Sequence, residues 1–286
     1  MKSQQDRQRR FSLEFFPART PEGNDKVREV HQGLAALKPD YFSVTFGAGG
    51  STRDGTLEMV TQISEEGQVA VAPHISCITS SREEITGLVN AYQKIGVKQL
   101  VVLRGDAPSG TGYDGGDFSY ANELVGFIRE KWGDAFHIEV AAYPEFHPEA
   151  VNAEVDLGNF KRKVDAGADS AMTQYFYNAD AYFGFIDSIE KLGVDIPVVP
   201  GIMPITNYTQ LARFSDRCGA EIPRWIRHRL EAYGDDMDSL RDFGHEVTLQ
   251  LCQRLLDQGA PGLHFYSMNR LEPCRRIWVE LGLSDS

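Results

Sequence analysis

The stretch Val101-Val102-Leu103-Arg104-Gly105-Asp106-Ala107-Pro108 carries the pattern that decides the fold. Three apolar residues, two of them β-branched, are followed at once by an arginine, a glycine, an aspartate and a proline. Such a run is typical of a buried strand that ends in a loop. We therefore expect a strand whose carboxyl end delivers two opposite charges into a loop.

Seven further apolar runs repeat this design along the chain. They are residues 11–17 with Glu14, 41–47 with Thr45, 69–77 with His74, 138–147 with Tyr143 and His147, 170–177 with Gln174, 197–204 with a Pro-Gly bend, and 262–270 with Arg270. Helical patterns lie between them, at about 21–37, 53–66, 82–96, 120–132, 152–166, 179–192, 207–214 and 224–259, the last broken near Gly234. Alternating strands and helices imply a parallel sheet, and eight such units imply an α/β fold closed into a (β/α)8 TIM barrel. The polar residues at the strand ends are then expected on one rim.

The length of 286 residues suits one such barrel, which we expect as a single domain over residues 11–286. With 42% hydrophobic and 24% charged residues, the chain can bury a sizeable core. Residues 1–10 hold four basic residues and lack the apolar core of a secretory signal. We expect them to form a disordered tail.

The net charge and the cysteine spacing indicate which classes of partner and which cellular compartment to expect. A net charge of −12 argues against general affinity for nucleic acid or anionic membranes. No apolar run approaches the roughly 18 residues of a membrane span. The four cysteines show no C-x-x-C spacing and are interpreted as reduced thiols, which favours a cytoplasmic protein.

Two strand ends offer groups for acid–base or anion chemistry, and each allows two interpretations. Glu14 is flanked by apolar residues; burial favours the protonated carboxyl that a general acid needs, but a structural ion pair is an equal alternative. Arg104 and Asp106 lie two apart, so they face the same way on a strand. One interpretation is that the two side chains pair with each other. The other is that Arg104 binds an anionic group and Asp106 binds a ring nitrogen or a developing cation.

Three histidines and one lysine also allow both a structural and a functional interpretation. His74, His147 and His264 lie near strand ends, but no metal-ligand spacing appears, so we expect no metal and place His264 in the core. Lys163 follows Lys161 and Arg162 on an expected helix, where it is either part of a solvated basic face or a phosphate contact. The chain has no Walker motif, no G-x-S-x-G elbow and no G-x-G-x-x-G after a strand, so any dinucleotide would bind at a barrel rim.

Nine segments, spread over nearly the whole chain after Arg10, together resemble the methylenetetrahydrofolate reductase family in its short bacterial form. They are Leu13-Glu14-Phe15-Phe16-Pro17, Ser43-Val44-Thr45-Phe46-Gly47-Ala48, Ala72-Pro73-His74, Leu103-Arg104-Gly105-Asp106, Ala142-Tyr143-Pro144-Glu145-Phe146-His147-Pro148-Glu149, Lys161-Arg162-Lys163-Val164-Asp165-Ala166-Gly167-Ala168, Thr173-Gln174, Pro200-Gly201-Ile202-Met203-Pro204 and His264-Phe265-Tyr266.

The resemblance implies a flavoprotein oxidoreductase of one-carbon metabolism and methionine supply. It would use FAD to reduce 5,10-methylenetetrahydrofolate to 5-methyltetrahydrofolate in a ping-pong cycle, with NADH preferred over NADPH as the hydride donor. A homo-oligomer is also expected. The family's eukaryotic members append a regulatory domain that binds S-adenosylmethionine, and we expect that regulation to be absent here.

The resemblance also assigns roles to residues. Glu14 matches the general acid that opens the folate imidazolidine ring, and Asp106 matches the aspartate beside the flavin. Positions that match FAD contacts are Thr45, His74, Arg104, Gly105, Asp106, Tyr120, Ala121, Tyr143, His147, Asp156, Asn159 and Lys163. Positions that match substrate contacts are Glu14, Gln174, Gln210, Phe214 and Arg270. The glycine-rich loop 109–117 matches no family pattern and is left unassigned.

Two other functions compete with this one. A lyase or Schiff-base aldolase would use Lys163 as its nucleophile, although two neighbouring cations suit that role poorly. A non-catalytic flavin or folate carrier would not need Glu14 for activity.

Overall fold

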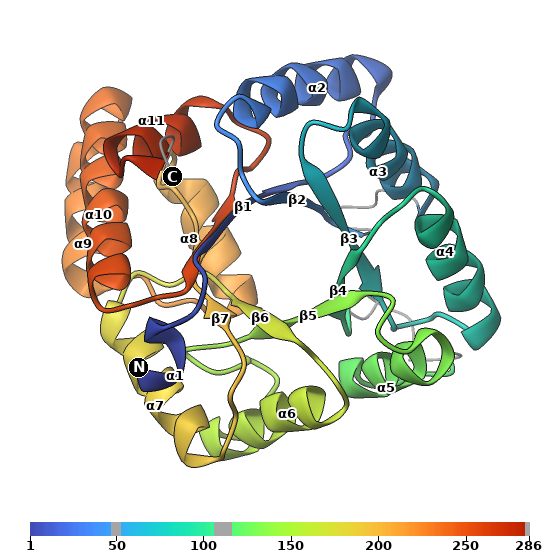
Figure 1. The fold of residues 1–286 in the computed structure, drawn as a ribbon. Helices are drawn as coiled ribbons and strands as arrows, with labels where there is room; N and C mark the ends of the chain where they lie inside the picture. The colour runs from blue at the N-terminus through green and yellow to red at the C-terminus, as the bar shows by residue number, and fades with distance from the viewer. Residues whose placement is uncertain (47–52, 106–115, 284–286) are drawn as a thin grey trace. The chain divides into compact units, whose positions relative to one another are not determined.

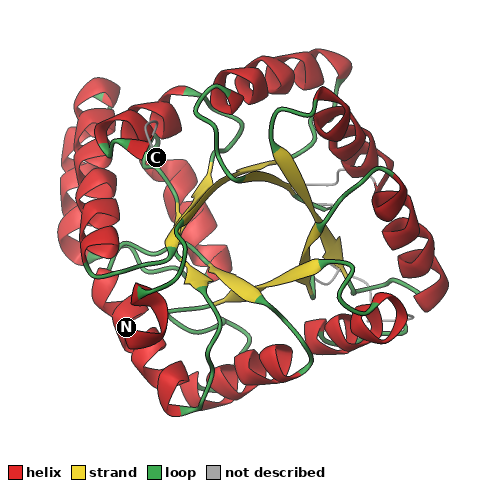
Figure 2. Ribbon diagram, in the orientation of Figure 1, coloured by secondary structure: helices red, strands yellow, loops and turns green. Residues whose placement is uncertain are grey.

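The computed structural model describes residues 1–46, 53–105 and 116–283, in which helices and strands alternate (Figures 1 and 2). The strands are β1 (Arg10–Phe15), β2 (Tyr41–Val44), β3 (Ala70–Ser76), β4 (Gln99–Leu103), β5 (His137–Ala142), β6 (Ser170–Thr173), β7 (Val198–Val199), β8 (Gly201–Ile202) and β9 (Gly262–Tyr266). The helices are α1 (Lys2–Gln5), α2 (Pro21–Ala35), α3 (Arg53–Glu66), α4 (Arg82–Lys94), α5 (Ala121–Trp132), α6 (Ala153–Asp165), α7 (Ala179–Lys191), α8 (Tyr208–Cys218), α9 (Arg224–Tyr233), α10 (Met237–Asp257) and α11 (Glu272–Glu280).

The strand order confirms the predicted fold class. The strands follow one another in the sheet as β7-β6-β5-β4-β3-β2-β1-β9-β8, and the pairs β1–β2, β2–β3, β3–β4, β4–β5 and β8–β9 are parallel. Parallel strands joined by helices in this order define the (β/α)8 TIM-barrel class.

The run at 197–204, expected as one strand, forms two. Pro200 lies between β7 and β8, and a proline has no N–H to donate to a sheet ladder. Its carbonyl oxygen still accepts a hydrogen bond from the backbone N–H of His264, at 2.9 Å. The described part of the chain therefore contains nine strands where eight were expected.

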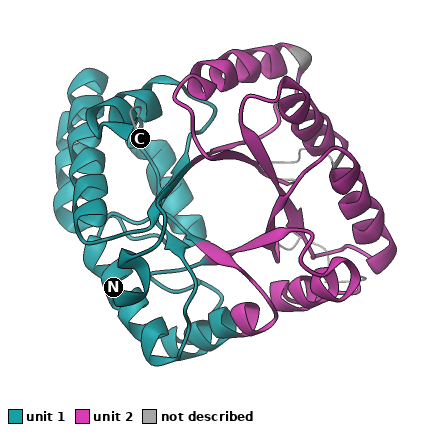
Figure 3. Cartoon of the chain, in the orientation of Figure 1, with its two compact units in different colours: residues 1–11, 142–161, 172–286 teal, residues 12–141, 162–171 magenta. Residues whose placement is uncertain are grey.

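The contacts within the chain divide it into two compact units (Figure 3). Unit 1 comprises residues Met1–Phe11, Ala142–Lys161 and Met172–Ser286, and unit 2 comprises Ser12–Ala141 and Arg162–Ala171. The expectation of a single domain over residues 11–286 stays a prediction.

Unit 2 has a core between its strands and the helices that follow them. In β1, Leu13 and Phe15 are fully buried. Phe15 packs edge-to-face on Phe42 of β2, with ring centroids 5.1 Å apart, and His31 of α2 contacts both rings. Because side chains alternate along a strand, Glu14 points to the opposite face from this core. In the register of β1 and β2, Glu14 is the partner of Ser43.

A buried carboxylate joins the beginnings of several strands in unit 2. Glu139 of β5 accepts hydrogen bonds from the hydroxyl of Tyr41 at 2.6 Å and the side-chain amide of Gln99 at 3.2 Å. The hydroxyl of Ser170 donates to its second oxygen, also at 3.2 Å. Tyr41, Gln99 and Ser170 are the first residues of β2, β4 and β6. This Glu139 network thus lies near the amino ends of the strands, away from the candidate residues at their carboxyl ends.

The first residues of unit 1 differ from the disordered tail that we expected. Residues Lys2–Gln5 form α1, and Gln4 is only 1% exposed. Its side chain donates to the carbonyl of Ile196 at 3.1 Å and accepts from the backbone N–H of Val198 at 2.9 Å. These bonds satisfy backbone groups beside β7, so the segment is held by polar contacts that a basic composition does not reveal.

Unit 1 also departs from the expected helix limits. Helix α8 continues to Cys218, past the expected end at Phe214, and ends at Gly219 in the left-handed conformation. Helix α11 was not predicted. It buries Cys274, Ile277 and Trp278 on one face. No helix in the described ranges is long and apolar enough to cross a membrane.

Candidate active site

Glu14 and His74 form a buried pair in unit 2. The distance between Glu14 Oε2 and His74 Nε2 is 3.4 Å, and the two side chains are 15% and 6% exposed. Glu14 is the last but one residue of β1 and His74 is the fifth of seven residues in β3, so both lie in the carboxyl-terminal part of their strands. The structural ion pair and the general acid both remain compatible with this contact, because an imidazole next to a carboxyl group can exchange a proton with it.

Thr45 follows directly after β2 in the same unit. Its backbone N–H donates to the carbonyl of Phe15, and its own carbonyl accepts from the buried hydroxyl of Thr56 at 3.0 Å. The hydroxyl oxygen of Thr45 is buried and has no hydrogen-bond partner among the described residues. Ser43 on the same face of β2 has a hydroxyl in the same state. Since buried polar atoms are nearly always paired, these hydroxyls are available to bind water or a polar ligand.

Arg104 and Gly105 follow β4, and their backbone is fixed by β3. The carbonyl of Arg104 accepts from the hydroxyl of Ser76 at 2.8 Å and from the backbone N–H of Ile78 at 2.9 Å. Gly105 has a positive φ of 86°, and a Cβ atom there would collide with Ser76 Oγ. Only glycine fits this position, which explains why the backbone after Arg104 can pass so close to β3.

Lys163 lies on α6 but does not belong to a solvated basic face. The side chain is half-buried, and Nζ donates a 2.6 Å hydrogen bond to the carbonyl of Ala141 in β5. A cation is thereby brought to the carboxyl end of a strand in unit 2, as a phosphate contact would require. Tyr120 and Ala121 lie at the start of α5, where Tyr120 is 59% exposed.

Tyr143 and His147 belong to unit 1 and pack against each other. Their rings meet edge-to-face with centroids 4.6 Å apart. The backbone N–H of Glu149 donates to Nδ1 of His147 at 3.1 Å, so the neutral ring carries its proton on Nε2. The backbone N–H of His147 donates to Asp156 Oδ2 at 3.0 Å, which places Asp156 beside this turn. Asn159 lies one turn further along α6 and is half-buried.

The predicted substrate residues of unit 1 come from three elements. Gln174 follows β6 and is half-buried, and its backbone N–H donates to the carbonyl of Ala142 at 2.8 Å. Gln210 and Phe214 lie on α8, where Phe214 is 39% exposed and so is not a core residue. Arg270 follows β9 and donates to Thr206 Oγ1 at 3.0 Å.

Arg270 is presented by a strained backbone. Met268 and Asn269, directly before it, both have positive φ, at 52° and 53°. Two consecutive non-glycine residues in the left-handed region are costly and persist where surrounding contacts enforce them. One such contact is the hydrogen bond from the backbone N–H of Asn269 to Ser267 Oγ, at 3.1 Å.

Some predicted features lie elsewhere. Asp106 and most of the loop 109–117 lie outside the described residues. His264 is fully buried in β9, which confirms its place in the core. No group of three or more His, Cys, Asp or Glu side chains that could hold a metal ion occurs within residues 1–46, 53–105 and 116–283.

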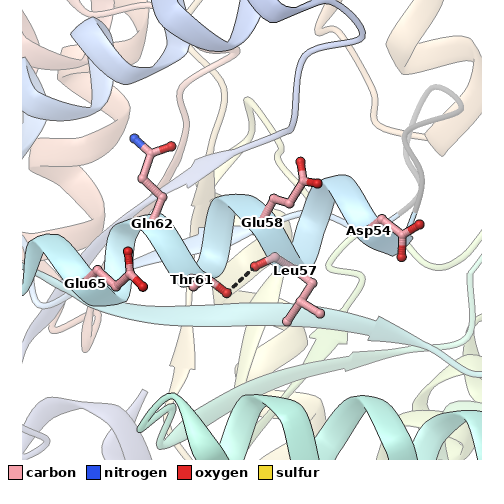
Figure 4. A pocket seen from close by; sticks show the side chains of 6 residues that line it. All are labelled: Asp54, Leu57, Glu58, Thr61, Gln62 and Glu65. Carbon is pink, nitrogen blue, oxygen red and sulfur yellow. Dashed lines mark hydrogen bonds between the residues drawn. The ribbon is translucent and has the colours of Figure 1, made fainter.

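A surface hollow on α3 contains none of the candidate residues. Its lining comes entirely from that one helix, and the only hydrogen bond drawn there runs from Thr61 Oγ1 to the carbonyl of Leu57, at 2.7 Å (Figure 4). Three carboxylates, those of Asp54, Glu58 and Glu65, surround it. With three carboxylates and no cationic side chain in its lining, this hollow disfavours an anionic cofactor or substrate.

Sequence reasoning missed two supporting residues, Ser76 and Glu145. Ser76 fixes the backbone at Arg104, and its position two residues after His74 on the same strand is the only signal in the sequence. Glu145 lies inside a recognised motif, but its contact with Glu221 joins residues far apart in the chain, which local spacing does not reveal.

Comparisons with known proteins place the chain in a family. The family model described as "Methylenetetrahydrofolate reductase" matches residues 1–282. The "5,10-methylenetetrahydrofolate reductase" of Salmonella typhimurium is 38% identical over 272 residues, covering 95% of this chain and 90% of that protein. The "Methylenetetrahydrofolate reductase (NADH) 1" of Arabidopsis thaliana is 35% identical over 288 residues, covering 96% of this chain and 48% of that protein.

Solved structures agree with the fold. A chain titled "Uncharacterized protein from Clostridium thermocellum binds two copies of 5-methyl-5,6,7,8-tetrahydrofolic acid" aligns with a TM-score of 0.65 at 14% identity, covering 98% of this chain and 95% of that chain. An oxaloacetate acetylhydrolase aligns with a TM-score of 0.54 at 8% identity, covering 94% of this chain and 79% of that chain. At these identities the likeness concerns the fold alone.

Parallel strands with chemistry-bearing residues at their carboxyl ends define a TIM-barrel enzyme. The buried Glu14–His74 pair and the orphaned hydroxyl of Thr45 are such residues. Together with the match over residues 1–282, they lead to one assignment: the chain belongs to the methylenetetrahydrofolate reductase family.

Proposed function

We propose that the protein reduces 5,10-methylenetetrahydrofolate to 5-methyltetrahydrofolate with electrons from NADH, passed through FAD in a ping-pong cycle. Membership of the family supports the folate reaction. The name of the Arabidopsis relative specifies NADH, which supports that donor over NADPH. We also expect a homo-oligomer in the cytoplasm, which stays a prediction.

The Glu14–His74 pair is the observation that carries this proposal. Ring opening of the folate substrate requires a proton at an amine nitrogen, and Glu14 is the carboxyl group that we assign to deliver it. Its side chain is mostly buried, so few water molecules compete for that proton. His74, with Nε2 3.4 Å from Glu14 Oε2, orients the carboxyl group and stabilises its charge after the transfer.

The chain's residues fit FAD, which would supply hydride transfer to and from its isoalloxazine ring. In unit 2, the buried Thr45 hydroxyl offers a hydrogen bond, and Arg104 and Lys163 offer positive charge for the pyrophosphate. In unit 1, His147 carries its proton on Nε2 and is a donor there. The remaining proposed contacts are His74, Gly105, Asp106, Tyr120, Ala121, Tyr143, Asp156 and Asn159.

Folate binding is proposed for Gln174, Gln210, Phe214 and Arg270 of unit 1. The exposed ring of Phe214 can stack on a planar pterin or benzoyl group. Arg270 is exposed and preset by its contact with Thr206, which suits a carboxylate of the glutamate end. Gln174 and Gln210 carry both donors and acceptors, as recognition of a pterin edge requires.

A visible spectrum of the purified protein tests the two half-reactions separately. We expect flavin absorbance that bleaches when NADH is added without oxygen and returns when 5,10-methylenetetrahydrofolate follows. A colourless protein that cannot be reconstituted with FAD would contradict the proposal.

The substitution Glu14→Gln tests the assigned acid. The variant should retain flavin reduction by NADH and lose at least about a hundredfold in folate-driven reoxidation, because general acid catalysis contributes roughly 10²–10⁴. The matched control is Glu65→Gln on the outer surface of α3, which should change neither step. A folate carrier without catalysis would be indifferent to both substitutions.

A further inference from the structure

Glu145 lies within the turn that connects β5 to α6 in unit 1, between Tyr143 and His147. Its Oε2 accepts a 2.8 Å hydrogen bond from the backbone N–H of Glu221. Glu221 follows helix α8 by three residues, so this bond joins the turn after β5 to the chain just beyond α8.

Two other contacts bring the same segments together. Gly219, the left-handed cap of α8, faces Pro148, since a Cβ placed at Gly219 would lie 3.3 Å from Pro148 Cδ. On the inner side of α8, Ser215 Oγ lies 3.0 Å from the hydroxyl of Tyr175, which follows Gln174 at the end of β6. Helix α8 is therefore fixed at its carboxyl end by the β5–α6 turn and by the residue next to Gln174.

The turn itself is strained around Glu145. The backbone N–H of Phe146 donates to the carbonyl of Tyr143 at 3.2 Å, which closes the turn. Phe146 has a positive φ of 56° and an exposed side chain, so burial of its ring does not offset the cost of that conformation. Such strain persists where neighbouring contacts over-determine the backbone, and the Glu145–Glu221 bond is one of those contacts.

The surroundings of Glu145 also disfavour its charge. Burial raises the pKa of the Glu145 carboxyl above its ordinary value, and the nearby Glu221 side chain raises it further, while the Glu221 backbone N–H lowers it. A glutamate on an open surface would meet no such cost. The hydrogen bond from the Glu221 backbone N–H offsets part of this cost.

We propose that Glu145 is a positioning residue that fixes the turn carrying Tyr143 and His147 against helix α8, which carries Gln210 and Phe214. This inference rests on the proposed function, in which the turn contacts FAD and the helix contacts folate. The carboxylate itself touches neither; it sets the distance between the two groups of side chains within unit 1. Folate should then bind a preset arrangement, which lowers the entropic cost of binding.

The experiment compares Glu145→Ala with Glu145→Gln in the full, FAD-loaded protein. Alanine removes the acceptor, whereas the side-chain oxygen of glutamine can still accept from Glu221 N–H. The matched control is Glu154→Gln on the exposed first turn of α6, which alters a charge in the same unit without touching α8.

Two readouts are measured on each variant. The first is hydrogen exchange at the Glu221 amide, which reports the bond directly and does not depend on any activity. The second is the KM for 5,10-methylenetetrahydrofolate against the rate of flavin reduction by NADH. In Glu145→Ala we expect amide exchange at Glu221 to be about tenfold faster and the KM for folate to be about tenfold higher. One hydrogen bond to a charged group changes an equilibrium constant by roughly a factor of ten. The rate of flavin reduction by NADH should not change.

The outcomes separate this inference from the proposed function. Recovery of both readouts in Glu145→Gln, with Glu154→Gln unchanged, would support the positioning role. An unchanged KM in Glu145→Ala, or an equal loss in flavin reduction, would overturn it. If the wild-type protein reduces no folate, the proposed function fails. The exchange measurement is independent of that result: unchanged exchange at the Glu221 amide in Glu145→Ala would show that the bond does not order this segment.

Discussion

Gly105 is a position at which no side chain larger than a hydrogen atom fits. A Cβ at this position would collide with Ser76 Oγ and come within 2.9 Å of Ile78 Cγ2, and the positive φ disfavours any other residue. We expect Gly105→Ala to lower the free energy of unfolding by about 3 kcal/mol, which combines a left-handed backbone penalty of roughly 1 kcal/mol with overpacking. Urea unfolding followed by circular dichroism measures it.

Gly96 provides the control for this prediction. It too has a positive φ, of 84°, but no atom lies within 4 Å of a Cβ placed there. Gly96→Ala should therefore lose only the backbone penalty of about 1 kcal/mol. Equal losses in the two variants would mean that the contact with Ser76 is relieved by small movements and contributes nothing.

For single residues, the sequence could indicate which residue types carry the chemistry, but not the distances between their side chains. Glu14 and His74 were both singled out as polar residues in apolar runs, and their side chains do meet within unit 2. Their contact depends on strand register, which no local pattern specifies. Glu145 was quoted within a motif but received no role, because its partner lies 76 residues away.

Among the elements, the strands of unit 2 depend on the Glu139 network. Glu139→Ala would leave the buried donors of Tyr41, Gln99 and Ser170 without their shared acceptor. We expect the free energy of unfolding to fall by about 3 kcal/mol, the typical result of breaking a buried charged network. Thermal and urea unfolding measure the loss.

Two variants calibrate this result. Tyr41→Phe removes one of the three hydrogen bonds and should lose about 1 kcal/mol. Glu130→Ala on the exposed side of α5 removes a carboxylate without a buried network and should stay within about 0.5 kcal/mol of the wild type. A Glu139→Ala loss as small as that of Glu130→Ala would mean that water replaces the carboxylate.

The order of elements was more predictable than their ends. Apolar runs and helical spacing predicted the strands and most of the helices. The Pro-Gly bend in the run 197–204 was expected, but its division of the run into two strands was not, because that depends on whether the proline meets a ladder position. Helix α11 was missed because its apolar residues fall within a charged segment, where tertiary packing decides.

The whole molecule should lose stability in acid. The side chain of His245 donates to Glu280 and lowers the pKa of that carboxyl below 4.5, and Arg276 adds to the effect. The Ser239 hydroxyl and backbone N–H likewise lower the pKa of Asp236 below 3.8. A lowered folded-state pKa contributes stability that is present above the unfolded-state value and is lost as the pH falls through the folded-state value.

The expected result is a lower urea midpoint at about pH 4 than at about pH 6. Glu145 opposes this trend, since its raised pKa contributes stability that is present below 4.5 and lost as the pH rises through the folded-state value. The variant Glu280→Gln should show a smaller difference between the two pH values than the wild type, because one of the titrating carboxylates is gone. A larger difference would contradict the assignment of Glu280.

The division into units has a consequence for synthesis on the ribosome. Unit 2 uses chain up to residue 171, so all of its residues have emerged while much of residues 172–286 is still untranslated. Unit 1 combines residues 1–11 with that last part, and Gln4 bonds to backbone around residue 197. During synthesis, the amino-terminal residues therefore lack their native contacts in unit 1 until the last part of the chain has emerged. The residues of unit 2 can already fold by then. In this protein the first residues to leave the ribosome are among the last to reach their native contacts.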